Sequence, residues 1–190
     1  MTSAQPELKE SGAHSLIQRL RKDPGVSRAL RTLRDGEKRL HVSGLRGASV
    51  AFFAEAVRDA LGRPVVICCP EEERARDIWS DLQTVSGAGA LIFPEKDIFP
   101  QRYEMRENLA VRGGRNGCLD RILQGDAGIV VTSILGFLEK TYPVELFRSS
   151  RRTLHNGDTI DLEELRSYLV RLGYEFSSVV EEMGQYAVRG

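Results

Sequence analysis

The sequence contains few of the residues that build disulfide frameworks or metal sites. Its 190 residues include three cysteines and three histidines. Cys68 and Cys69 are adjacent in an apolar run, where we expect small buried residues, and the histidines are scattered along the chain. Because cysteine and histidine do not occur at chelating spacing, no metal site is predicted.

Long hydrophobic runs and a charge of one sign are also missing. No apolar run approaches the roughly 20 residues of a membrane-spanning helix, and the N-terminus lacks the layout of a signal peptide. The 27 basic residues are balanced by 27 acidic residues, so the chain has no global field that attracts nucleic acid. We therefore expect a cytoplasmic protein without membrane contacts, in which any argument from charge is local.

What the sequence does contain is an alternation of strand and helix patterns. Two short helical patterns come first, split by Asp23-Pro24-Gly25. The alternation that follows predicts an α/β fold with a mostly parallel sheet flanked by helices. We expect strands at residues 40–43, 64–69, 91–93 and 128–132, and helices at residues 48–61, 71–85, 108–123 and 134–140.

Three regions are predicted along the chain. Residues 1–36 form an N-terminal helical extension, of which residues 1–12 are expected to be mobile, and residues 37–146 form the α/β domain. After Tyr142-Pro143 the pattern changes to one helix among short extended pieces, which predicts a small α+β domain over residues 147–190. The last expected strand runs into the end of the chain, so we expect this domain to be incomplete and the chain to be a piece of a longer protein.

The most informative motif is the turn that precedes the third helical pattern. A strand, a glycine loop with Gly44 and Gly47, and a helix follow the order of a phosphate-binding loop, G-x-x-x-x-G-K-[ST], in which the lysine binds phosphate and the hydroxyl binds magnesium. Aligned from Gly44, the last three positions are Ser49, Val50 and Ala51. Val50 offers no cation and Ala51 no oxygen, so we predict a nucleotide-binding fold with a degenerate loop and no bound cofactor. An ordinary turn with two glycines fits the same residues.

Residue sets for catalysis are not evident. No Ser or Cys stands beside a His with an orienting acid, as nucleophilic catalysis requires. The acidic runs 71–73 and 163–164 begin helices, where carboxylates complement the helix dipole. The strand end Thr132-Ser133 carries no acidic partner for a metal. No catalytic residue is therefore predicted.

Two other functions stay open on the residues alone. One is a nucleotide hydrolase with an irregular phosphate loop. The other is a DNA-binding module that uses basic side chains, although a solvated helix face has the same pattern. Its candidate residues are Arg19, Arg21, Lys22, Arg28, Arg31 and Arg34 in the N-terminal helices, with Lys96, Arg102 and Arg106.

Several motifs resemble the N-terminal region of bacterial transcription-repair coupling factors. The most specific is the closing stretch from Leu172 to Gly190, whose last residues follow an aromatic, small, x, Arg-Gly pattern. The similarity covers about residues 37 to 190 and includes the segments Gly44–Ala51, Pro64–Pro70, Phe93–Asp97 and Ile129–Thr132.

The resemblance implies a function for the chain. In that family this region is similar to the excision-repair subunit UvrB, but its phosphate loop is lost and its small inserted domain docks the damage-recognition protein UvrA. The implied role is a non-catalytic module that recruits UvrA to stalled RNA polymerase in nucleotide-excision repair. Arg189 falls on the family's UvrA-contacting arginine, and Tyr186 is the aromatic residue of the same strand. On the residues alone, Arg189 could instead pair with Glu181 or Glu182.

The resemblance also implies what the longer parent protein does. The parent would be an ATP-driven DNA translocase, with ATP and magnesium bound in its motor part. Contacts to RNA polymerase and double-stranded DNA would be made by the rest of the parent, outside this chain.

Overall fold

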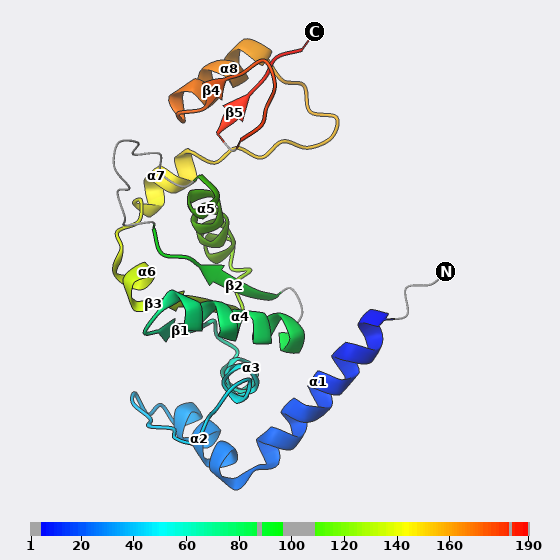
Figure 1. The fold of residues 1–190 in the computed structure, drawn as a ribbon, viewed down its shortest axis with the longest axis vertical. Helices are drawn as coiled ribbons and strands as arrows, with labels where there is room; N and C mark the ends of the chain where they lie inside the picture. Colours follow the sequence, from blue (N-terminus) through cyan, green and yellow to red (C-terminus); the bar gives the residue numbers. More distant parts are fainter. Residues whose placement is uncertain (1–4, 87–88, 97–108, 183, 190) are drawn as a thin grey trace. The chain divides into compact units, whose positions relative to one another are not determined.

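The computed structural model describes residues 5–86, 89–96, 109–182 and 184–189 (Figure 1). The chain divides into two compact units, one made of residues 1–96 and 114–138 and the other of residues 97–113 and 139–190. Each unit is described by itself.

A three-stranded parallel sheet lies at the centre of the first unit. The strands lie in the order β1 (Val65–Cys69), β3 (Ile129–Ser133) and β2 (Ala90–Phe93). All five residues of β3 are buried, as expected for the central strand of a parallel sheet that is covered by helices. The predicted α/β class and parallel strand pairing are therefore confirmed.

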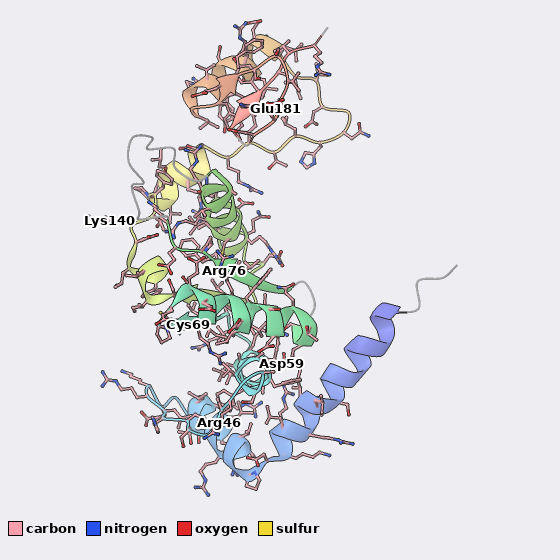
Figure 2. All side chains as sticks on the ribbon, in the orientation of Figure 1. Arg46, Asp59, Cys69, Arg76, Lys140 and Glu181 are labelled. Atoms are coloured by element: carbon pink, nitrogen blue, oxygen red, sulfur yellow. The ribbon has the colours of Figure 1, made fainter. Side chains whose placement is uncertain are left out.

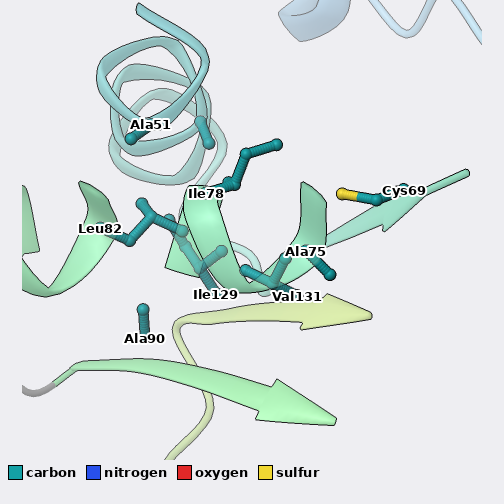
Figure 3. Packing of buried hydrophobic residues seen from close by; sticks show 9 residues of the cluster. Ala51, Cys69, Ala75, Ile78, Leu82, Ala90, Ile129 and Val131 are labelled. Atoms are coloured by element: carbon teal, nitrogen blue, oxygen red, sulfur yellow. The ribbon is translucent and has the colours of Figure 1, made fainter. Parts of the chain in front are cut away.

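Helices cover both faces of this sheet. Ile129 and Val131 of β3 pack against α4 (Glu72–Ser86) and α3 (Ser49–Leu61), as Figure 3 shows. Val130 points to the opposite face, because successive strand residues alternate in direction, and it packs with Cys118 of α5 (Leu109–Leu123). The helix α6 (Ile134–Leu138) follows β3 directly. The Oγ of Ser133 caps it by accepting a hydrogen bond from the Gly136 N–H at 3.0 Å.

Two N-terminal helices pack on α3. They are α1 (Gln5–Lys22) and α2 (Pro24–Arg34), whose Ile17 and Leu30 contact Ala56. The split between them is confirmed, because Asp23 caps α2 by accepting hydrogen bonds from the N–H groups of Gly25 and Val26. Of the stretch 1–12 that we expect to be mobile, the residues from Gln5 onward belong to α1.

Residues 40–43 form no strand, contrary to the prediction. Leu40 and Val42 are each 38% exposed, and β1 pairs only with β3 in the part of the sheet that the structure describes. The pattern offers just two apolar side chains to one face, and a strand also needs a neighbour with which to form hydrogen bonds. After β2, the structure describes the chain only up to Lys96 before it resumes at residue 109, so Arg102 and Arg106 lie outside the described residues.

The second unit is small. It contains α7 (Val144–Ser149), which the sequence did not predict, α8 (Leu162–Arg171), and a parallel pair formed by β4 (Glu175–Phe176) and β5 (Gln185–Tyr186). In Figure 1, α8 lies beside the β4–β5 pair. The extended piece expected at residues 151–154 is not a strand. No helix in the described part of the chain is long and apolar enough to cross a membrane.

Candidate functional site

The glycine loop before α3 has the backbone of a tight turn. Gly44 and Gly47 have φ angles of 87° and 53°, in the left-handed region that favours glycine. A Cβ placed on either residue would meet nothing within 4 Å. The backbone conformation alone therefore accounts for both glycines, and no close approach of another group is needed.

The amide groups at the start of α3 are already hydrogen-bonded within the chain. The N–H of Ser49 donates to the carbonyl of Arg46 at 3.1 Å, and the N–H groups of Ala51 and Phe52 donate to the carbonyl of Ala48. The Oγ of Ser49 accepts from the Arg46 N–H and donates to the Arg46 carbonyl, both at 2.7 Å. A phosphate-binding loop directs its amides at the ligand, whereas these amides close the turn on itself.

The next two positions belong to the hydrophobic core. Ala51 is fully buried with Ile78 and Leu82 (Figure 3). Val50 is partly buried and packs against the same cluster. In a working loop these positions carry the lysine and the magnesium-binding hydroxyl. Here they supply packing, so the residues present do not fit a triphosphate with its metal.

The second candidate region is the β4–β5 pair, where Tyr186 lies. Two backbone hydrogen bonds hold the pair, from Glu175 N to Gly184 O at 2.8 Å and from Ser177 N to Tyr186 O at 2.9 Å. The ring of Tyr186 packs edge-to-face on Phe176 with ring centroids 5.7 Å apart. The half-buried Tyr186 ring therefore has an aromatic packing partner on the neighbouring strand of the second unit.

The turn that leads into β5 is fixed by a side chain. The Oε1 of Gln185 accepts hydrogen bonds from the N–H groups of Glu181 and Glu182 at 2.9 and 3.1 Å. Gly184 completes the turn with a φ of 84°. These contacts fix the start of the strand that carries Tyr186.

Arg189 lies three residues beyond Tyr186 and is exposed. Within the described residues it forms no ion pair, so the alternative of a local pair with Glu181 or Glu182 does not occur there. A guanidinium in this state can form two parallel hydrogen bonds to a carboxylate of another molecule.

Sequence reasoning missed a buried arginine, Arg115 on α5. It is 4% exposed, its Nη1 donates to the carbonyl of Pro94 at 2.6 Å, and its guanidinium stacks 4.0 Å from the centre of the Phe93 ring. These contacts tie α5 to the end of β2. No local sequence signal indicates this role, because Arg115 lies among the glycines of a helix with weak periodicity.

Metal-binding groups and reactive thiols were sought in the described part of the chain. Over the described residues, no group of three His, Cys, Asp or Glu side chains is placed to hold a metal ion. Burial raises the pKa of the Cys69 thiol, and it raises the pKa of the Cys118 thiol to about 11. At neutral pH both thiols are protonated, which disfavours them as nucleophiles.

Comparison with known proteins gives relatives but no family model, since none matches the chain. The transcription-repair-coupling factor of Myxococcus xanthus is 30% identical over 166 residues, which cover 83% of this chain and 14% of that protein. The factor of Bacillus subtilis is 26% identical over 159 residues, 83% of this chain and 13% of that protein, and one of Staphylococcus aureus is 27% identical over 157 residues.

Over about 83% of its length, the chain is similar to the N-terminal region of transcription-repair coupling factors. The resemblance predicted from the sequence motifs is thereby confirmed. The chain spans only 13% to 14% of the length of these coupling factors, in their N-terminal region.

Proposed function

We propose that this chain is a non-catalytic module of a transcription-repair coupling factor that recruits UvrA to stalled RNA polymerase in nucleotide-excision repair. The observation that carries the proposal is the exposed, unpaired Arg189 beyond the anchored Tyr186, in a chain whose relatives are named transcription-repair-coupling factors. Such a role takes place in the cytoplasm of a bacterium.

The geometry of β5 supports a docking role. Tyrosine and arginine are enriched among the residues that dominate binding energy at protein interfaces. The ring of Tyr186 is held by Phe176, so little conformational freedom is lost when a partner packs on it. Arg189 needs to break no ion pair of the described part of the chain before it binds a carboxylate.

The glycine loop supports the non-catalytic part of the proposal. Val50 and Ala51 contribute to the core, and the neighbouring amides are bonded within the chain. ATP and magnesium would then act in the motor part of the parent protein. RNA polymerase, and the DNA along which the parent translocates, would be engaged by other parts of the parent, with this chain as the platform that presents the UvrA-docking surface.

The proposal is tested by titrating the full chain against purified UvrA in a calorimeter. Arg189→Ala should weaken binding roughly 30-fold, the loss typical of an interface residue that contributes about 2 kcal/mol. Arg189→Lys should recover only part of the affinity, because an ammonium cannot form the bidentate pair. The matched control is Arg171→Ala, which removes another exposed arginine of the same unit. Equal affinity of Arg189→Ala and the unmodified chain would contradict the site.

A further inference from the structure

Positive charge is concentrated in one part of the neutral chain. Residues 19–46 contain nine Lys or Arg residues and three Asp or Glu residues, a net charge of +6, whereas the whole chain has a net charge of zero. These residues lie at the end of α1, in α2 and in the segment that joins α2 to α3, all within the first unit. The remainder of the chain therefore carries the compensating negative charge.

Most of these cations have no protein partner. Seven are exposed and form no ion pair within the part of the chain that the structure describes, and we call them the basic surface. Two others have structural contacts: Arg21 pairs with Asp59 at 2.7 Å, and the Nε of Arg34 donates to the carbonyl of Ala60. The basic surface consists of Arg19, Lys22, Arg28, Arg31, Lys38, Arg39 and Arg46.

The acidic residues of this region do not pair with the basic surface. Asp23 caps α2 through two backbone N–H groups, and the Oε1 of Glu37 accepts from the backbone N–H groups of Lys38 and Arg39. The carboxylates of Asp23 and Glu37 are held by the backbone, and Asp35 forms no ion pair within the described residues. The seven basic side chains therefore stay available to an external anion.

The fold directs the basic surface into solvent. The buried residues Ala29 and Leu30 of α2 lie on the side opposite Arg28 and Arg31, which stand one turn apart. Arg46 and its neighbours belong to a segment in neither helix nor strand. Figure 2 shows nitrogen-tipped side chains that stand away from the ribbon around α2 and this segment.

We propose that the basic surface binds the phosphate backbone of double-stranded DNA. Five of its seven members are arginines, whose planar guanidinium groups suit bidentate hydrogen bonds to phosphate oxygens. Binding needs no rupture of an ion pair in the described residues, and it is repaid by the release of condensed counterions.

The composition of the surface favours a duplex over other anionic partners. Residues 19–46 contain no Phe, Tyr or Trp. Single-stranded nucleic acid is bound largely by stacking bases on aromatic rings, and tryptophan and tyrosine are enriched, together with arginine, at the centres of protein interfaces. Cations without aromatic residues match a regular phosphate backbone, so the binding is expected to be independent of sequence.

The test measures binding of the full chain to a labelled random-sequence duplex of roughly 30 base pairs by fluorescence anisotropy, at several salt concentrations. With four to seven phosphate contacts, affinity should fall roughly 10²- to 10⁴-fold between about 50 and 200 mM salt. A flat salt dependence, or no binding at 50 mM salt, would overturn the proposal.

Variants locate the binding to the basic surface. A quadruple variant combines Arg28→Gln, Arg31→Gln, Lys38→Gln and Arg39→Gln. It should weaken binding at least about tenfold and reduce the salt slope, which is the slope of log affinity against log salt concentration, by about 3 to 4 in magnitude. A matched control removes the same charge from exposed arginines elsewhere: Arg63→Gln, Arg148→Gln, Arg166→Gln and Arg171→Gln. Equal losses in the two variants would overturn the proposal, because net charge alone would then explain them.

A double variant and two competitors complete the experiment. The double change Lys38→Gln and Arg39→Gln lies outside any helix or strand, so it should reduce the salt slope by about 2 without affecting the fold even if the quadruple variant is unstable. Polyglutamate and a single-stranded oligonucleotide serve as competitors. Weak displacement of the duplex by both supports the proposal, and displacement by either at equal charge concentration overturns it. UvrA is absent from these measurements, so their outcome is separate from that of the docking proposal.

Discussion

The two units of the molecule bury their side chains to very different degrees. In the first unit, every residue of β3 is buried and Leu82 of α4 is completely shielded from solvent. In the second unit, no residue of α7, α8, β4 or β5 is buried within the described part of the chain. Leu162 and Phe176 there are 70% and 62% exposed.

The difference in burial shows that different interactions stabilise the two units. Apolar burial is the main favourable term in folding, and the first unit has a continuous core on one face of its sheet with a second cluster on the other. The second unit depends more on local hydrogen bonds, such as the caps formed by Asp161 and the turn formed by Gln185. A stable platform is thus joined to a small unit whose apolar and charged side chains face outward, as an interaction surface requires.

The largest expected effect comes from a cavity in the first unit. Leu82→Ala should lower the free energy of unfolding by about 2–5 kcal/mol, because the side chain is completely buried among Ala51, Ile78 and Ile129. The single tryptophan, Trp79, reports on this unit, since its Nε1 donates to the Ala90 carbonyl at 3.1 Å. Urea unfolding followed by tryptophan fluorescence measures the change.

The control for this cavity is the same substitution in the second unit. Leu162→Ala removes a side chain that is 70% exposed, and it should change stability by less than about 0.5 kcal/mol. If Leu82→Ala cost less than about 1 kcal/mol, the contrast between the units would be wrong.

A smaller effect is expected from the helix caps. Asp161 caps α8 by accepting hydrogen bonds from the N–H groups of Glu163 and Glu164 at 2.8 and 3.1 Å. Asp161→Ala should destabilise α8 by about 1 kcal/mol, and Asp161→Asn should preserve most of the cap. The measurement is amide hydrogen exchange of α8, which should become roughly five times faster on loss of the cap.

The matched cap in the first unit is Asp23, with nearly the same geometry at the start of α2. Asp23→Ala should accelerate exchange in α2 less, because Ala29 and Leu30 hold that helix to its neighbours by burial. Equal acceleration in α2 and α8 would show that core packing does not distinguish the two units.

The strands of the sheet could be predicted because their signal is local. The run Val65–Cys69 is apolar throughout and Ile129–Ser133 begins with three apolar residues, which is typical of strands in a parallel sheet covered by helices. Of these two strands, only Ile129–Ser133 is buried on both faces. Val66 and Cys68 of β1 are exposed, so the expectation that Cys68 is a buried residue is wrong. Residues 40–43 show an alternation that a strand also shows, but a strand needs a partner that local sequence does not specify. Helix α7 has six residues, too few for a periodic pattern to stand out.

The candidate sites were predictable in type but not in detail. Gly44 and Gly47 predict a glycine loop, and Val50 stands at the position where a phosphate-binding loop has its lysine. That the Oγ of Ser49 closes on Arg46 depends on the three-dimensional path of the chain, as does the burial of Ala51. Arg115 was missed for the same reason, since its contact with Pro94 joins residues 21 positions apart.

The smallest expected effect on stability is that of the Cys118 thiol, and it is absent near neutral pH. All three cysteines lie in the first unit. Burial raises the pKa of the Cys118 thiol from an ordinary value near 9.0 to about 11, against the weaker opposing charges of Arg121 and Arg115. Between these values the unfolded chain binds fewer protons than the folded chain, so stability falls as pH rises from about 9 to 11 and is unaffected below that window. Urea unfolding of the unmodified chain and of Cys118→Ala, followed by Trp79 fluorescence, should show a stability difference that shrinks above pH 9. A pH-independent difference for Cys118→Ala would mean that the thiol is not shielded in the folded first unit, and the contrast in burial between the units would lose one of its supports.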